Sequence, residues 1–359
     1  MSVEIIAEKV RRTERISPDE ARELWNAPLW LLASLADGAK RRVSGERVYY
    51  NRNFHIEPTN LCVFNCRFCS YRRPPGDPEA WDMTMDEVEA MARERAGRGV
   101  TEVHIVGGVH PHHGLDYYIE MIRRVKAALP DAAVKAFTAV ELAYMIRNAG
   151  LDIGEGLRRL KEAGMDAIPG GGAEIFDERL RAEICPEKGS TAEWFAVHDA
   201  AHRLGIPTNA TILYGHVETL DHRIDHLDRL RRQQDATGGF NAFIPLKYRN
   251  SGNSMSAVGE VSVIEDLRML AMSRIYLDNI PHIKAYWVMY GKQTAELALA
   301  FGADDLDGTI DDSTRIYSMA GADDRRPSMS VDEIRRMAAR AGMRAVERDT
   351  FYNEIETAL

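Results

Sequence analysis

The sequence predicts an α/β protein with a (β/α)8 barrel of the TIM type, and two observations support this prediction. Short apolar runs alternate with amphipathic helical stretches through most of the 359 residues, which is the pattern of parallel β/α units. Glycine-rich and polar residues come directly after the predicted strands, where a barrel gathers them at one mouth. An open doubly wound sheet would gather them at a single switch point instead.

Three parts are expected along the chain: an N-terminal helical extension at 1–49, the barrel at 50–320, and a C-terminal helical extension at 321–359 packed on the barrel. The first part contains Ser17-Pro18-Asp19-Glu20, a capping box with proline at the first helical position, which predicts a helix starting there. Leu29–Leu35 predicts a second apolar helix.

The barrel elements follow from runs of apolar and β-branched residues and from the helical spacing between them. The expected strands are Phe54–Ile56, Glu102–Val106, Ala133–Phe137, Ala167–Ile168, Thr208–Leu213, Ala242–Pro245 and Ile283–Trp287. The expected helices are Met85–Arg98, Tyr117–Ala128, Ile153–Ala163, Ala192–Leu204, His222–Thr237, Ile264–Asp278 and Thr294–Phe301.

Charge and hydropathy exclude several classes of protein. The formal net charge of −9 and the pI near 5.7 argue against nucleic-acid binding, which requires a basic patch. The longest apolar stretch, near residues 29–36, is too short to cross a bilayer, and the N-terminus does not resemble a secretory leader. We therefore expect a soluble, cytoplasmic protein without nucleic-acid or membrane partners.

Three cysteines lie close together, Cys62, Cys66 and Cys69, with the spacing C-x3-C-x2-C. Thiolates hold iron–sulfur clusters, usually four per cubane, so three would leave one iron open to a ligand. A zinc site with a histidine as fourth ligand, or unrelated buried thiols, are the alternatives, and zinc normally requires a closed set of four ligands. Cys185 is interpreted as a buried structural thiol.

The cysteine loop resembles that of radical S-adenosylmethionine (SAM) enzymes, and segments along nearly the whole chain resemble the aminofutalosine synthase family. The segments that carry this resemblance include Glu102–Gly108, Lys135–Glu141, Pro169–Phe176, Thr208–Thr219, Gly238–Pro245, His282–Trp287, Phe301–Thr309 and Glu347–Thr350. Some are shared with the dehypoxanthine futalosine cyclase and with the radical SAM enzymes of deazaflavin synthesis. Lys135–Glu141, His282–Trp287 and the Arg348 tail look most like the synthase. Glu57 and Ser70-Tyr71 depart from the family pattern.

The resemblance implies a [4Fe-4S] cluster held by Cys62, Cys66 and Cys69, with SAM bound on its open iron. Phe68 would lie against the adenine, and the Gly107-Gly108 backbone would contact the methionine amino group. Glu174 is a candidate for the ribose hydroxyls or the SAM amine. The adenine and ribose would be lined by the segment Thr211-x-Leu213-x-Gly215-x-x-Glu218, in which threonine replaces the first family glycine.

The family substrate is 3-[(1-carboxyvinyl)oxy]benzoate, whose two carboxylates need cations in a dry barrel mouth. His216, Arg249 and Lys284 are the leading candidates. Other members of the set are Lys247, Arg348, His55, His110 and His282. Tyr286 and Trp287 are core residues or walls for the aryl ring, and Asp304-Asp305-Leu306-Asp307 is read as a supporting acidic cluster rather than a metal site.

By resemblance, the reaction adds the 5′-deoxyadenosyl radical of SAM to the vinyl carbon of this substrate. Aryl migration and decarboxylation then give 6-amino-6-deoxyfutalosine in menaquinone biosynthesis, so the enzyme is a transferase. An electron donor such as flavodoxin or ferredoxin is implied as a partner, and a homodimer is considered. The cyclase or another radical SAM relative is the rival reading, and a non-catalytic iron–sulfur electron carrier is the rival from a different class.

Overall fold

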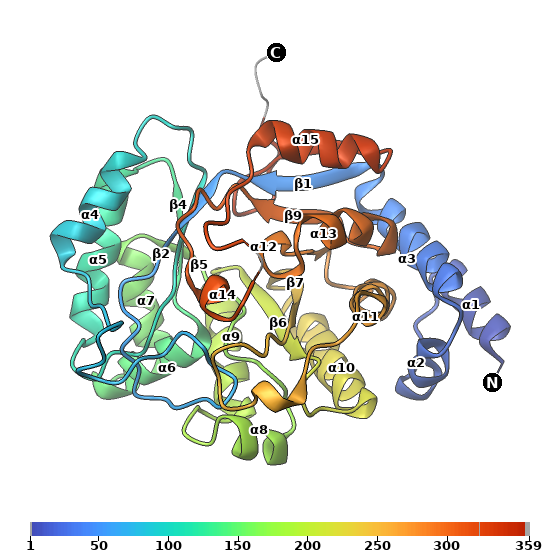
Figure 1. Cartoon of the computed structure of the whole chain (residues 1–359), viewed down its shortest axis with the longest axis horizontal. Coiled ribbons are helices and arrows are strands. Elements are labelled where there is room, and N and C mark those ends of the chain that lie inside the picture. Colours follow the sequence, from blue (N-terminus) through green and yellow to red (C-terminus); the bar gives the residue numbers. More distant parts are fainter. Residues whose placement is uncertain (1, 323, 356–359) are drawn as a thin grey trace.

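The named strands are all paired in parallel in the computed structural model, which describes residues 2–322 and 324–355 (Figure 1). They are β1 (Arg47–Asn51), β2 (Asn53–Ile56), β3 (Glu102–Ile105), β4 (Ala133–Ala136), β5 (Met165–Ala167), β6 (Thr208–Tyr214), β7 (Phe240–Lys247), β8 (His282–Ile283), β9 (Asp305–Gly308) and β10 (Arg344–Glu347).

The strands close into a ring. One sheet has the order β2-β3-β4-β5, and a parallel bridge between Ile168 and Thr208 continues it to β6, β7 and β8. A second bridge, Lys284 to Asp305, leads on to β9, which pairs with β1. Because only Arg52 separates β1 from β2, the two form one bent strand that closes the circle. The TIM-type barrel prediction is confirmed.

Helices surround this ring (Figure 1). The α-helices are α1 (Val3–Arg11), α2 (Pro18–Trp25), α3 (Leu29–Ser44), α4 (Met85–Glu94), α5 (Leu115–Ala128), α6 (Ala139–Asn148), α7 (Ile153–Ala163), α8 (Glu178–Ile184), α9 (Thr191–Arg203), α10 (Leu220–Thr237), α11 (Val263–Tyr276), α12 (Trp287–Tyr290), α13 (Lys292–Ala298), α14 (Ile316–Met319) and α15 (Val331–Arg340). Two short 3-10 helices are Ser256–Val258 and Leu299–Phe301.

Successive strand residues point alternately to the helices and to the barrel interior. Phe54, Val103 and Val134 are fully buried on the helix side. The neighbouring positions along the same strands are polar, and they align at one level because His55 pairs with His104, and His104 with Lys135. Barrel interiors are usually filled by branched apolar residues, so this polar layer marks a functional region.

The N-terminal helices pack on the outside of the barrel, with α3 against α11. Ser17 caps α2 with the predicted capping box, in which the Glu20 carboxylate also bonds the Ser17 N–H. At the other end of the chain, β10 pairs with the outer edge of β1. The division of the chain at residues 49 and 320 stays a prediction.

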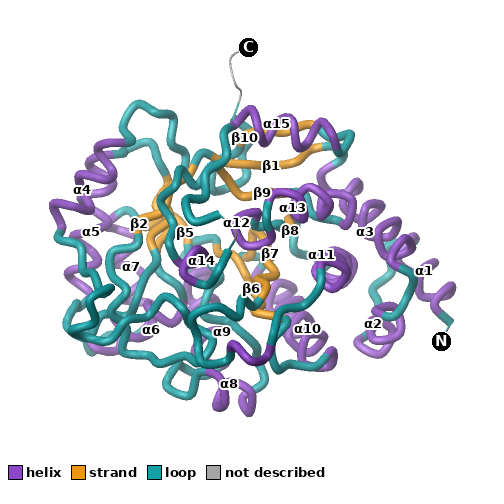
Figure 2. The backbone as a smooth tube through the Cα atoms, viewed as in Figure 1, coloured by secondary structure: helices purple, strands orange, loops and turns teal. Residues whose placement is uncertain are grey.

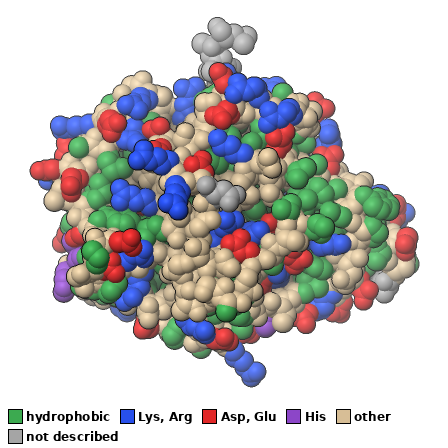
Figure 3. All heavy atoms as spheres, viewed as in Figure 1, with side chains coloured by type: hydrophobic (Ala, Val, Ile, Leu, Met, Phe, Trp, Pro, Cys, Tyr) green, Lys and Arg blue, Asp and Glu red, His purple; other side chains and the backbone are tan. Residues whose placement is uncertain are grey.

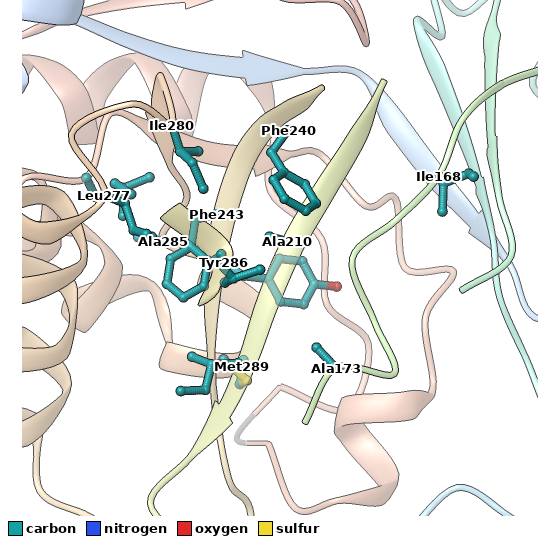
Figure 4. Packing of buried hydrophobic residues seen from close by; sticks show 14 of the residues in the cluster. Ile168, Ala173, Ala210, Phe240, Phe243, Leu277, Ile280, Ala285, Tyr286 and Met289 are labelled. Carbon is teal, nitrogen blue, oxygen red and sulfur yellow. The ribbon is translucent and has the colours of Figure 1, made fainter. Parts of the chain in front are cut away.

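The hydrophobic core lies between the strands and the helices. Figure 4 shows the part of it around β6 and β7, where Phe240, Phe243 and Leu277 are buried. On the face seen in Figure 3, acidic and basic side chains are interspersed. Among the described residues, no helix is both long and apolar enough to span a membrane.

The sequence-based element assignments differ from the structure in a few places. The predicted strand Ile283–Trp287 is wrong beyond its start, because β8 ends at Ile283 and Trp287 begins α12. The strands β1, β9 and β10 and the helices α6, α8, α12 and α14 were not predicted. Thr138 and Glu141 form the capping box that starts α6.

Candidate active site

A cavity of about 260 Å³ occupies the barrel interior. Its outer part is lined by residues that follow the carboxyl ends of the strands, and we call this part the rim: the three cysteines of the long loop 57–84 (Figure 2), Gly107, Gly108, Glu141, Glu174 and Lys188. Its inner part is lined by residues within the strands and by Lys284, which directly follows β8, and we call this part the floor: His55, Glu102, His104, Lys135, Lys284 and Asp307.

The three loop cysteines all face the cavity and are partly exposed, and all are free thiols. Burial raises the pKa of the Cys62 thiol to about 11 and raises that of Cys69 as well. Unligated thiolates are therefore disfavoured here, and a bound cation would be needed to compensate them. Cys185 is fully buried, outside the cavity lining, and hydrogen-bonded to Cys66.

The segment after β3 holds the cysteine loop by direct backbone contacts. The Gly108 N–H donates to the Thr59 carbonyl at 2.7 Å, and the Val63 N–H donates to the Val109 carbonyl at 2.9 Å. A Cβ on Gly108 would lie 2.2 Å from the Leu61 carbonyl oxygen. Glycine is therefore required here to let the two backbones approach, whatever else it contacts.

Acidic groups of the rim are held by capping and ion-pair contacts. Glu141 accepts from the Gly107 N–H at 3.1 Å and closes the capping box of Thr138. Burial raises the Glu141 pKa to about 7. Glu174, at a positive φ of 50°, pairs with Lys188. The Lys188 ammonium also lies 5.5 Å from the centre of the Phe68 ring, so one cation links these rim residues.

The floor carries two buried ion pairs. Lys135 Nζ lies 2.6 Å from the Glu102 carboxylate, and Lys284 Nζ lies 2.5 Å from that of Asp307. Burial alone would raise the Glu102 pKa, but Lys135 and Lys284 together hold it well below its usual value. Burial lowers the His55 pKa to about 4, so this ring is neutral at pH 7.

Four predicted site residues lie outside this cavity lining. His216 Nε2 lies 3.0 Å from the Leu213 carbonyl, and its Nδ1 lies 3.3 Å from Glu218. Glu218 accepts from the N–H groups of Gly215 and His216 and pairs with Arg223. Its carboxylate therefore caps the backbone turn that follows β6. Arg249 contacts the Gly321 carbonyl and Glu260.

The adjacent acidic cluster also has a structural role. Asp304 pairs with Arg274, Asp305 with Arg348, and Asp307 with Lys284. Since the three carboxylates turn to three different cations, they do not converge on a metal ion. Trp287 is core, with its indole N–H donating to the Gly308 carbonyl at 2.8 Å, whereas Tyr286 lines the cavity.

Comparison with known proteins agrees with this geometry. Residues 56–230 match the Radical SAM superfamily, and residues 237–358 match the CofH/MqnC C-terminal region. The chain is 43% identical over 355 residues to an aminodeoxyfutalosine synthase of Thermus thermophilus, covering 98% of this chain and 95% of the relative. It belongs to the radical SAM superfamily.

This radical SAM chain has other similar proteins. A 5-amino-6-(D-ribitylamino)uracil–L-tyrosine 4-hydroxyphenyl transferase of Methanocaldococcus jannaschii is 40% identical over 355 residues, covering 96% of this chain and 98% of the relative. The crystal structure of methylornithine synthase superposes with a TM-score of 0.77 at 17% identity, covering 95% of this chain and 97% of that one. Because the sequence identity is low, this structural similarity supports the fold alone.

The residues at the rim fit the radical SAM cofactors, a [4Fe-4S] cluster and SAM. Three thiols from one loop face the cavity, and the fourth cysteine of the chain is outside its lining. Three ligands leave one cluster iron for SAM. Of the described residues, Asp82, His110 and His113 place three ligand atoms within 4.8 Å, and the cysteines do not form such a group. Single-ion ligands must converge in this way, so the zinc alternative is not favoured.

Sequence reasoning missed several cavity residues among those the structure describes. Glu102, His104 and Lys135 of the floor and Glu141 and Lys188 of the rim were not in the predicted site. A signal existed for two of them, because Glu102 and Lys135 are charges inside predicted strands. The roles assigned to the predicted residues stay predictions.

Proposed function

We propose that this enzyme is an aminofutalosine synthase, a transferase that joins the 5′-deoxyadenosyl group of SAM to 3-[(1-carboxyvinyl)oxy]benzoate. The product would be 6-amino-6-deoxyfutalosine, formed with aryl migration and loss of carbon dioxide, in menaquinone biosynthesis. The observation that carries the proposal is the 43% identity to an aminodeoxyfutalosine synthase over nearly the full length of both chains.

The cluster with SAM would supply the radical. The protein would position the reactants, place charged groups around them and limit the access of water. Cys62, Cys66 and Cys69 would ligate the cluster, and Phe68, Gly107, Gly108 and Glu174 face the same rim, where SAM would bind. The protein would therefore bring the adenosyl group and the substrate together in one cavity.

Of the three residues predicted for the substrate carboxylates, Lys284 is the one that lines the cavity. His216 and Arg249 lie outside its lining, so their proposed role is to support the strand ends rather than to contact the substrate. Gly215 and Glu218 would likewise shape the turn after β6. Their assignment to adenine and ribose remains a prediction.

The remaining partners follow from the chemistry. Reduction of the cluster needs a one-electron donor, for which flavodoxin or ferredoxin is proposed. A cytoplasmic location is proposed because such donors and free SAM are found there. A homodimer stays a prediction.

A second candidate activity has a specific observation behind it, the 40% identity to a 5-amino-6-(D-ribitylamino)uracil–L-tyrosine 4-hydroxyphenyl transferase. That name specifies a tyrosine and a ribityl uracil as the groups joined. The dehypoxanthine futalosine cyclase is the third possibility, from the shared sequence segments. Two lysines on the floor favour a substrate whose ring carries a carboxylate over one that ends in an uncharged phenol.

The test is an anaerobic assay of the reconstituted enzyme with reductant and SAM, in which each candidate substrate is supplied separately and the products are identified by mass spectrometry. A product that contains both the adenosyl and benzoate parts supports the synthase. Transfer of the hydroxyphenyl group from tyrosine, or cyclisation of dehypoxanthine futalosine with free 5′-deoxyadenosine, would replace the proposal with the corresponding relative's activity. The Cys66→Ala enzyme is the negative control for this assay.

A further inference from the structure

The floor contains more charge than the fold requires. Lys135, Lys284, Glu102 and Asp307 are all at least nine-tenths buried, and they form two ion pairs on neighbouring walls. The pairs belong to one group, since Lys284 also acts on Glu102. Two cations and two anions make the group neutral. Burying such pairs is often no more favourable than apolar packing, so stability alone does not account for them.

Two histidines beside these pairs have unsatisfied ring nitrogens. Neither Nδ1 nor Nε2 of His55 has a hydrogen-bond partner among the described residues, and the same holds for Nε2 of His104. The two rings are 4.5 Å apart, and His55 is only 2% exposed. Buried polar atoms nearly always have partners, and both rings line the cavity. A ligand with polar atoms would satisfy them.

Another part of the cavity lining is apolar. Ile244 and Leu246 of β7 belong to it, whereas the charged floor residues come from β3, β4 and β9 and from Lys284, which directly follows β8. Tyr286, which also lines the cavity, has a hydroxyl without a partner among the described residues (Figure 4). The inner cavity therefore offers an apolar face beside two lysine ammonium groups, which suits a flat ring that carries an anionic group.

The chemistry of the proposed substrate fixes its direction, and this step rests on the proposed function. The vinyl carbon must meet the adenosyl group, which is delivered at the cysteine rim. The ring carboxylate is meta to the enol ether oxygen, so the two substituents diverge, and with the vinyl group at the rim the carboxylate points inward. In a barrel, that direction leads to the floor.

We propose that the floor is a binding site for an aryl carboxylate, with Lys135 and Lys284 as its cations and His55 as a neutral hydrogen-bond donor. The site determines specificity by selecting a ring that ends in a carboxylate over one that ends in an amide or a phenol. Glu102 and Asp307 hold the two lysines in place as positioning residues, and they keep the group neutral in the absence of substrate.

Calorimetric titration of the full-length, cluster-loaded protein tests this inference without turnover. The protein is kept oxidised and saturated with SAM, so that the rim is occupied. The probes are 3-hydroxybenzoate and its uncharged analogue 3-hydroxybenzamide. Wild-type protein is expected to bind the carboxylate at least about tenfold more tightly than the amide, which corresponds to about 1.4 kcal/mol.

Two double variants remove a floor pair without leaving a lone charge: Lys135→Met with Glu102→Gln, and Lys284→Met with Asp307→Asn. Asparagine is suitable at 307 because Asp307 has a positive φ of 70°. Either variant should lose most of the tenfold preference. The matched control is Lys9→Met with Glu20→Gln, which removes a partly buried pair outside the cavity lining, with an N–O distance of 2.7 Å. It should keep the wild-type preference.

Each outcome bears on one claim. Equal affinity of the wild-type protein for the two probes overturns the floor site even if no variant folds. An unchanged preference in a folded floor variant does the same. If the preference depends on the floor but no adenosyl–benzoate product forms in the assay, the site stands and the proposed function fails. If the product forms and the preference is absent, the proposed function stands and the floor site fails.

Discussion

The rim and the floor of the cavity are built in different ways. Rim groups stand on loops after the strands and act through sulfur and backbone, as Cys66 and Gly108 do. Floor groups stand inside the strands or directly at a strand end and act through fixed charge, as Lys135 and Lys284 do. The rim therefore suits a reagent that is common to the superfamily, while the floor suits one particular substrate.

The supports of the two regions differ in the same way. Capping and backbone contacts to neighbouring loops hold the rim, so a small change in one loop displaces its cysteines. Behind the floor lies a second layer of charge, in which Arg348 pairs with Asp305 and Thr350 bonds Glu102. Changes at the rim should affect cofactor loading, and changes at the floor should affect substrate selection and stability. The predictions below test this separation, starting from the largest effect.

Removing a rim thiol should abolish the chemistry while leaving the fold intact. In Cys66→Ala the cluster loses one of three ligands, so iron content and activity are expected to fall to background. The circular dichroism spectrum should stay that of wild type, because Cys66 is half-buried and on a loop. Cys185→Ala is the comparison variant: it removes the hydrogen bond to Cys66 but no thiol of the cavity lining, so it should retain iron. A fully active Cys66→Ala enzyme would refute the cluster assignment.

A methyl group at Gly108 should act on the rim without touching a ligand. Its Cβ would lie 2.2 Å from the Leu61 carbonyl oxygen, so the cysteine loop must shift. Overpacking of this kind costs about 1–3 kcal/mol. Iron per chain after reconstitution is expected to drop several-fold, with a lower Tm. Gly114→Ala is the control, because its Cβ would meet nothing within 4 Å. Normal iron loading in Gly108→Ala would contradict the close fit.

Removing a single floor charge should affect stability more than cofactor loading. Lys135→Met leaves Glu102 buried without its nearest cation, and breaking such a pair costs about 3–5 kcal/mol. Urea denaturation is expected to show this loss, while iron content stays normal. Adding Glu102→Gln should recover most of the stability, because no lone charge remains. If the double variant is as unstable as the single one, the cost comes from packing rather than from charge.

The contrast between rim and floor also explains what could be predicted from the sequence. The three cysteines of the rim lie within one short segment, and Gly107 and Gly108 are adjacent in another, so local spacing is enough to indicate their chemistry. The strand–helix alternation likewise indicated the barrel, because the helix-facing strand positions are apolar, as Phe54 and Val103 are.

The floor could be predicted only in part: Lys284 and His55 were candidates, but the ion pairs could not be predicted because their partners are far apart in the chain. Asp307 and Lys284, or Glu102 and Lys135, are recognisable as pairs only once the strands are adjacent. The acidic segment of β9 does not have a strand pattern, and its burial depends on cations from other elements. A missed local signal accounts for α6, since Thr138 and Glu141 are a capping box that sequence inspection can find.

The last predicted effect concerns Glu57, which directly follows β2 between the floor residue His55 and the rim cysteines. Its carboxylate accepts from Thr314 and from the N–H groups of Arg315 and Ile316, and so fastens the loop that carries Tyr317 to the cavity. Burial raises the Glu57 pKa from 4.5 to about 7, against the opposite effect of these donors. The folded state therefore binds this proton more tightly than the unfolded state does.

It follows that Glu57 contributes a loss of stability as the pH rises from about 4.5 to 7. The slope is at most about 1.4 kcal/mol per pH unit. Buried histidines with lowered pKa values, such as His55, act in the opposite direction, so the total curve does not isolate the effect. The measurement is therefore the difference in unfolding free energy between wild type and Glu57→Gln, from urea titrations across this range. The unfolding free energy of the wild type should fall relative to that of Glu57→Gln as the pH rises. Parallel curves would show that Glu57 is already ionised at the lower pH and connects the two regions as a permanent charge.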